Sequence, residues 1–228
     1  MNPPTSAVGS VKVSAKLRRA WERGPWYTLG AIVRAGIRVV AERSTSVILV
    51  ALPGNVQPVQ PALHPDETCI FHENEAGDLL KWTGKDYDTS ERIAQLSESL
   101  AMKAPDDGGK LHTVLVRGRL AGWGWSFAPF VLPETWGLRL FDPPLKAVAL
   151  IAFYTIPEFR GRKLYQALLA HILMQHFSDG EASAYIDVNE RNQISLQAIR
   201  RVGFRPVARY RSWRFLKWRR TVITRIRD

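Results

Sequence analysis

The feature that most constrains the fold is an almost entirely apolar run at residues 147–154, followed by a short basic turn and a helical pattern. A strand that is apolar on both faces is typical of the centre of a sheet with helices on both sides. The helical pattern, at residues 161–177, places Leu164, Leu168 and Ile172 on one side. The chain is therefore expected to contain an α/β unit with this strand at its centre.

The segments around this strand continue the alternation of strands and helices. Helical patterns are expected at residues 90–103 and 192–202. Strand patterns are expected at residues 69–73, 112–117, 120–127, 182–188, 204–218 and 221–227, and Arg117-Gly118-Arg119 forms a short hairpin turn. The order β-α-β-β-β-α-β-α-β-β predicts a mixed β-sheet flanked by helices, which is an α/β (α+β mixed-sheet) class.

The first 65 residues have a different pattern. Residues 12–42 show basic and apolar positions at helical spacing, which predicts one or two amphipathic helices. A strand pattern follows at residues 47–51, and Pro58, Pro61 and Pro65 then exclude a helix or central strand. We expect residues 1–65 to be a basic extension with a strand and a proline-rich linker, and residues 66–228 to form the main domain.

Charge and composition restrict the class of protein and its partners. The 228 residues are 46% hydrophobic and 23% charged, as expected of a folded globular protein. The formal net charge is +11, and residues 200–228 contain eleven basic side chains against Asp228, so an acidic partner is expected. With one cysteine, no apolar helix of spanning length and no pattern of a secretory signal, the cytoplasm is the expected location.

The basic turn after the apolar strand is a candidate phosphate site. Arg160, Arg162 and Lys163 lie where the following helix begins, and a helix N-terminus offers unpaired N–H groups and a partial positive charge to anions. About thirty residues later a strand ends at Asn189, and Asn192 is placed to cap the next helix. Gly203-Phe204 then ends that helix.

At these residues the chain resembles the GNAT superfamily of acyl-CoA-dependent N-acyltransferases. Arg160-Gly161-Arg162-Lys163-Leu164-Tyr165 is similar to the family's pyrophosphate loop, Q/R-x-x-G-x-G/A. The stretch from Asn189 to Phe204 is similar to its V-N-x-x-N-x-x-S…G-F segment. The resemblance covers roughly residues 67–228 and implies a GNAT-like fold.

The resemblance also implies a mode of substrate binding. The central strand and the strand ending at Asn189 splay apart, and acetyl-CoA or another acyl-CoA enters the cleft between them. An amine of a small-molecule acceptor attacks the thioester directly, and no metal is required. The implied CoA-binding residues are Phe153, Tyr154, Thr155, Ile156, Arg160, Gly161, Arg162, Lys163, Leu164, Tyr165, Asn189, Asn192 and Ser195.

The sequence departs from the family pattern at three positions. Lys163 and Tyr165 replace small residues of the loop, so Lys163 is expected to add charge and Tyr165 to crowd the site. Ile199 stands where many members have a tyrosine that protonates the leaving thiolate. Ser195 or Tyr165 could take that role, or the thiolate leaves unprotonated.

A general base is not fixed by any motif. The candidates are Glu134 and Asp142, which lie in the aromatic, proline-bearing loop expected to face the acceptor. Glu158, beside the pyrophosphate loop, is interpreted instead as an acid at a helix N-terminus.

Two alternatives to acyl-CoA chemistry stay open. In one, the same fold takes its acyl group from acyl carrier protein, whose acidic surface would suit the arginine-rich C-terminal segment. In the other, a non-catalytic GNAT-like module binds nucleic acid or anionic membrane through its basic termini, at the periphery of the membrane in the latter case. Independently of these alternatives, a homodimer stays open, with residues 1–65 as one candidate for mediating it.

Overall fold

The computed structural model describes residues 41–84, 89–94, 109–128, 146–215 and 218–226. Contacts between Cα atoms divide the chain into two compact units, Met1–Ser44 with Arg211–Thr221 and Thr45–Tyr210 with Val222–Asp228. In the first unit the hydroxyls of Ser44 and Ser212 are hydrogen bonded at 2.8 Å. The second unit holds the candidate site. The expected N-terminal helices and the aromatic loop with Glu134 and Asp142 lie outside the described residues.

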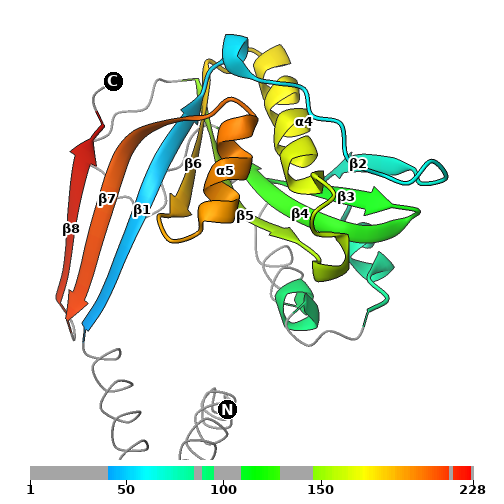
Figure 1. Ribbon diagram of the computed structural model, residues 1–228, viewed down its shortest axis with the longest axis horizontal. Helices are drawn as coiled ribbons and strands as arrows, with labels where there is room; N and C mark the ends of the chain where they lie inside the picture. Colours follow the sequence, from blue (N-terminus) through cyan, green and yellow to red (C-terminus); the bar gives the residue numbers. More distant parts are fainter. Residues whose placement is uncertain (1–40, 85–88, 95–108, 129–145, 216–217, 227–228) are drawn as a thin grey trace, which may run out of the picture. The chain divides into compact units, whose positions relative to one another are not determined.

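One mixed sheet organises the fold, with the strand order β2-β3-β4-β5-β6-β1-β7-β8 (Figure 1). The pairing of β5 with β6 is parallel, whereas β2–β3, β3–β4, β4–β5 and β1–β6 pair antiparallel. The strands are β1 (Ala41–Ala51), β2 (Cys69–Glu73), β3 (Gly109–Val116), β4 (Arg119–Phe127), β5 (Ala147–Thr155), β6 (Ser183–Asn189), β7 (Arg205–Phe215) and β8 (Trp218–Arg225). The expected mixed sheet with flanking helices is confirmed.

The strand β1 pairs with the centre of this sheet. Ser46 to Ala51 pair with Asn189 to Ala184, so β1 lies directly beside β6. Ile48 and Leu49 are fully buried, as expected of an interior strand. The strand expected within the first 65 residues is therefore part of the same sheet as the pyrophosphate-loop strand.

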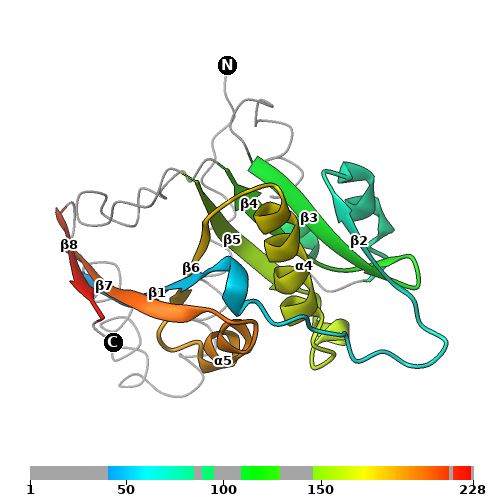
Figure 2. The same ribbon diagram turned by 90° about the horizontal axis from the view of Figure 1, so that it is seen from above.

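Two helices pack on the sheet near its diverging strands. Helix α4 (Leu164–Ser178) contacts β3, β4 and β5, and its core residues Leu168, Leu169, Ile172 and Leu173 are almost completely buried (Figures 1 and 2). The shorter helix α5 (Gln193–Arg201) follows β6 and contacts α4. No helix in the described part of the chain combines the length and apolar character needed to cross a bilayer.

A buried polar cluster joins α4 to the sheet. The Ser126 hydroxyl on β4 is hydrogen bonded to His112 Nε2 on β3 at 2.8 Å and to His176 Nε2 on α4 at 2.9 Å. Desolvation by burial lowers the pKa of His112 to about 4, so that imidazole is neutral at physiological pH. Its neutral form stabilises the packing of α4 on this face.

The opposite face of β3 and β4 is covered by the 3₁₀ helix η2 (Ala76–Lys81), and the helical turn at residues 89–94 contacts β5 through the hydrogen bond between the Thr89 and Tyr154 hydroxyls at 3.1 Å. Here the buried Asp78 carboxylate accepts from Thr113 and from Lys81 Nζ at 2.7 Å, and its Oδ2 is 2.8 Å from His72 Nδ1. Trp123 packs on Tyr154 with ring centroids 4.8 Å apart. The aromatic side chains of β4 therefore belong to the core on this side.

A β-bulge in β5 separates it from β6. Trp123 and Trp125 of β4 face Tyr154 and Ile151, so Gly124 opposes two β5 residues, and Ala152 has a left-handed φ of 56°. The β5–β6 ladder runs from Ala147–Ser183 to Leu150–Ile186 and stops there, although both strands continue. The two strands diverge beyond Leu150, which leaves the backbone of the last β5 residues without strand partners on that side.

The proline-rich segment from Asn55 to Glu67, here called the strap, crosses the ends of both helices. The Gln57 N–H donates to Val202 O after α5 at 3.0 Å, and the Ala62 N–H donates to Arg162 O before α4 at 2.9 Å. Gly203, with φ +113°, lies so close that a Cβ there would sit 1.9 Å from the Asn55 carbonyl oxygen. The strap thus holds the backbone just after α5 and the backbone just before α4, and both segments border the cleft.

Candidate acyl-CoA cleft

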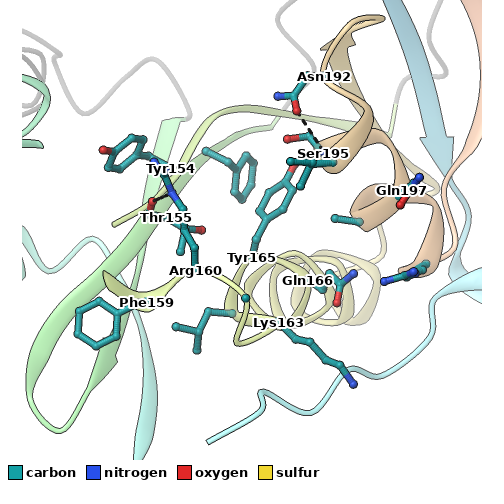
Figure 3. A pocket seen from close by; sticks show the side chains of 16 residues that line it. Tyr154, Thr155, Phe159, Arg160, Lys163, Tyr165, Gln166, Asn192, Ser195 and Gln197 are labelled. Atoms are coloured by element: carbon teal, nitrogen blue, oxygen red, sulfur yellow. Dashed lines mark hydrogen bonds between the residues drawn. The ribbon is translucent and has the colours of Figure 1, made fainter. Parts of the chain in front are cut away.

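A cavity of about 730 Å³ opens where β5 diverges from β6, between the N-terminal turn of α4 and one face of α5 (Figure 3). Most of the CoA-binding residues implied by the sequence line it. The lining residues are Phe153, Tyr154, Thr155, Phe159, Arg160, Gly161, Lys163, Leu164, Tyr165, Gln166, Asn192, Ile194, Ser195, Gln197, Ala198 and Arg201. The lining contains three cationic side chains and no carboxylate among the described residues, so it is suited to an anionic ligand.

The N-terminus of α4 faces this cavity without a side-chain cap. Lys163 is the N-cap residue, and its side chain makes no capping hydrogen bond. Among the described residues, nothing accepts from the backbone N–H groups of Gly161, Arg162 or Lys163. These amides and the positive end of the α4 dipole can bind a phosphate group, whereas at α5 the Asn192 side chain already accepts from Ser195 N–H at 3.2 Å.

Two residues of the loop have a left-handed backbone conformation. Gly161 has φ +81°, and Lys163 has φ +56° although it is not glycine. An L-residue in this left-handed region is strained, and the surrounding structure must hold it there. The Lys163 side chain is exposed and, as Figure 3 shows, leaves the loop in the direction opposite to Tyr165.

The three basic side chains of the loop have different surroundings. Arg160 Nε donates to the Thr155 carbonyl at 3.1 Å, which folds its guanidinium back over the end of β5. Arg162 instead points away from the cavity, and its Nη1 donates to both carboxylate oxygens of Glu67 at 2.9 and 3.1 Å. Lys163 is exposed, lines the cavity and adds its charge beside the free amides of α4.

Glu67 anchors the loop to the strap. Its carboxylate accepts from the His64 N–H at 3.0 Å, and this bond, followed by the bond from Arg162 and the charges of Arg162 and Arg117, lowers the pKa of Glu67 in spite of its burial. Arg162 and Arg119 both lie over the Phe159 ring at 5.5 Å from its centroid. This cation–π stacking and the ion pair tie the loop to β4 and to the strap.

Tyr165 forms part of the cavity wall. Its ring rises from the first turn of α4 toward α5 in Figure 3 and packs on Phe153 with ring centroids 5.6 Å apart. Desolvation by burial, with the charge of Asp187 on β6, raises the pKa of the Tyr165 hydroxyl above its ordinary value, so the hydroxyl stays protonated at neutral pH. Residues on both sides of this ring, from β5 and from α5, line the same cavity.

Helix α5 provides the other wall. Ser195 is half-buried in its first turn and lines the cavity, whereas Ile199 is fully buried in the core. Ile194, Ala198 and Arg201 form a stripe at helical spacing along the cavity. Sequence reasoning missed this stripe, although the Asn192 cap fixes the phase of α5 and could have indicated it.

Not every residue implied by the resemblance reaches the cavity. Ile156 is completely buried, Arg162 is paired with Glu67, and Asn189 is exposed with its side chain accepting from the Arg191 N–H at 2.9 Å; none of the three lines the cavity. Glu134 and Asp142 lie outside the described residues. No group of described side chains is arranged to hold a metal ion.

Comparison with known families agrees with this geometry. The sequence profile of the GNAT acetyltransferase family matches residues 76–204, which is more than half of the chain. The chain belongs to the GNAT acetyltransferase family. Enzymes of this family use acetyl-CoA, and the matched region contains the diverging strands, the loop and α5. No curated protein matches the sequence.

Solved structures are similar to this chain at low sequence identity, and those with a TM-score above 0.5 share its fold. A glucosamine N-acetyltransferase region of a fungal multi-domain β-N-acetylglucosaminidase superposes with a TM-score of 0.52 at 14% identity, over 81% of this chain and 22% of that one. A tandem GNAT protein from the clavulanic acid biosynthesis pathway gives 0.52 at 13%, over 81% and 55%. A GCN5-related N-acetyltransferase from Kribbella flavida gives 0.44 at 12%, over 76% and 59%. This GNAT chain thus spans less than two thirds of the length of these proteins.

Proposed function

We propose that this protein is an acyl-CoA N-acyltransferase that transfers an acyl group, with acetyl as the first candidate, to a primary amine of a small-molecule acceptor. The observation that carries the proposal is the uncapped N-terminus of α4, which opens into a cavity formed by the divergence of β5 and β6. Free amides with Lys163 beside them suit the diphosphate of CoA. The backbone of β5 beyond Leu150, which has no strand partner on the β6 side, suits the amide groups of pantetheine.

The proposed reaction needs little covalent chemistry from the protein. The acceptor nitrogen attacks the thioester carbonyl carbon, the C–S bond breaks, and an amide forms. The proton that the nitrogen loses balances the proton taken up by the thiolate. The contribution of the protein is to align the two substrates in the cleft and to stabilise the oxyanion of the tetrahedral intermediate by hydrogen bonds.

Ser195 and Tyr165 are the proposed donors to the leaving thiolate, because both line the cavity and Ile199 has no proton to give. The raised pKa keeps Tyr165 protonated but makes it a weak acid. We therefore expect Ser195→Ala and Tyr165→Phe to lower kcat without abolishing turnover. Glu134 and Asp142 are kept as candidate bases, to be tested by the basic limb of the pH–rate profile of Glu134→Gln and Asp142→Asn.

Calorimetric titration of the full chain with acetyl-CoA and CoA tests the first step, and release of free CoA thiol with a panel of primary amines tests the second. We expect saturable binding of both nucleotides. Absence of binding at millimolar ligand contradicts the proposal. Acyl transfer from acyl carrier protein without competition by CoA would assign a different donor to the same fold.

A further inference from the structure

The charges in the cavity exceed what the diphosphate needs. Three cations line it, Arg160, Lys163 and Arg201, and among the described residues none of them forms an ion pair. Arg160 and Lys163 belong to the loop before α4, whereas Arg201 lies on α5, the opposite wall. A ligand that uses cations of both walls must carry anionic groups at two separate places.

Arg201 is well placed to bind a second anion. It occupies the last turn of α5, at the end of the stripe formed with Ile194 and Ala198, and its side chain is exposed toward the cavity. Its helix is fixed at this end by the strap, through Gln57 N–H and Val202 O at 3.0 Å. The preceding residue, Arg200, is also exposed but does not line the cavity.

The chemistry of the proposed donor supplies two anionic groups. CoA carries the diphosphate that joins pantetheine to adenosine, and it carries a separate monophosphate on the 3′ oxygen of the ribose. The phosphopantetheine arm of an acyl carrier protein lacks the adenosine and this monophosphate. A cation that reads the 3′-phosphate therefore also distinguishes free CoA thioesters from carrier-bound ones.

Resting on the proposed function, we infer that Arg201 binds the ribose 3′-phosphate and makes the cleft specific for 3′-phosphorylated CoA thioesters. Lys163 and the free amides of α4 bind the diphosphate, and Arg160 stays on the Thr155 carbonyl at the β5 end. The planar guanidinium of arginine suits the fork of two phosphate oxygens. Arg201 is thus a specificity-determining residue for the donor.

The test compares CoA with 3′-dephospho-CoA, by calorimetric titration of wild type, Arg201→Gln and Arg200→Gln at one ionic strength. Wild type should bind CoA about tenfold more tightly than dephospho-CoA, as expected for a charge-assisted hydrogen bond. Arg201→Gln should lose this difference by weakening CoA binding alone. Arg200→Gln removes the same charge from the same helical turn and should leave both affinities unchanged within about twofold.

Each other outcome is informative. Equal affinity of wild type for the two nucleotides, or an equal loss of both in Arg201→Gln, overturns the role of Arg201 and leaves the proposed function standing. Equal effects of Arg200→Gln and Arg201→Gln would show that only the general positive charge of α5 matters, which also overturns the specific role of Arg201. If wild type binds neither nucleotide, the proposed function itself fails. Circular dichroism melts of both variants confirm that each is folded.

Discussion

Lys163 combines a strained backbone with a useful charge, and two substitutions separate these effects. Its φ of +56° at the N-cap of α4 is unfavourable for an L-residue by about 1–2 kcal/mol. Lys163→Gly removes that strain but adds the greater flexibility of glycine in the unfolded state, about 0.5–1 kcal/mol. The variant should therefore be more stable than wild type by about 0.5–1 kcal/mol, with a rise in Tm of about 2 °C for a chain of this size.

The same substitution should weaken CoA binding. The ammonium group of an exposed lysine is worth less than about 1 kcal/mol, so its loss should raise the Kd for CoA about two- to fivefold, and less at high salt. Lys163→Met is the matched control, because it removes the charge and keeps the strained backbone. It should show the weaker CoA binding of the glycine variant with the thermal stability of wild type.

Urea unfolding and calorimetric titration with CoA of wild type, Lys163→Gly and Lys163→Met separate the effect of backbone strain from that of the charge. A Lys163→Met variant as stable as Lys163→Gly would show that the left-handed backbone stores no strain. If Lys163→Gly bound CoA more tightly than wild type, close approach of the loop backbone would outweigh the charge. In that case the reasoning that lysine compensates for the missing glycine would be refuted.

Three further predictions concern stability. Gly203→Ala should destabilise by about 3 kcal/mol in urea unfolding, because its Cβ would overlap a backbone carbonyl of the strap, and Gly180→Ala, with φ +92° and open space, should lose less. His112 has a pKa of about 4 in the fold against 6.5 in the unfolded chain, so its contribution to the free energy of unfolding is complete above pH 6.5 and falls toward pH 4 by up to roughly 3 kcal/mol. His112→Gln should therefore flatten the dependence of stability on pH between these values. An unchanged pH dependence contradicts this prediction. Because the pKa of Glu67 is depressed in the fold, its contribution to stability is complete above its ordinary pKa of 4.5 and is lost as the pH falls through the lower pKa of the folded state. Glu67→Gln should therefore lower Tm at pH 7 and reduce the further loss of Tm on acidification.

Much of the fold could be predicted because its signals are local. The apolar run of β5, the leucine spacing of α4 and the cap at Asn192 each depend on neighbouring residues in the sequence, and the structure contains each element within a few residues of its expected bounds. The free N-terminus of α4 follows from the same local pattern. Local signals therefore located the loop that is proposed to bind the CoA diphosphate.

The rest depends on contacts between distant segments. The sequence of β1 does not indicate that this strand lies between β6 and β7. The sequence around Arg162 likewise does not indicate an ion pair with Glu67, which is 95 positions away. The bulge at Ala152 is similar, because alanine gives no warning of a positive φ that glycine or asparagine would give. As a result, the sequence pattern predicts that Arg162 binds the ligand, whereas in the structure its guanidinium pairs with Glu67 of the strap.

The effect of Tyr165, which replaces a small residue of the loop motif, depends on a position far away in the sequence, Gly124. Taken alone, the large side chain predicts a crowded pyrophosphate loop. In the structure the ring rises from α4 toward α5, where it forms part of the cavity wall and packs on Phe153. The Phe153 ring in turn lies against Gly124 of β4, where a Cβ would come within 2.3 Å of it. The absent side chain at Gly124 makes room for Phe153, and Phe153 accepts Tyr165, so the amides before α4 stay open toward the cavity.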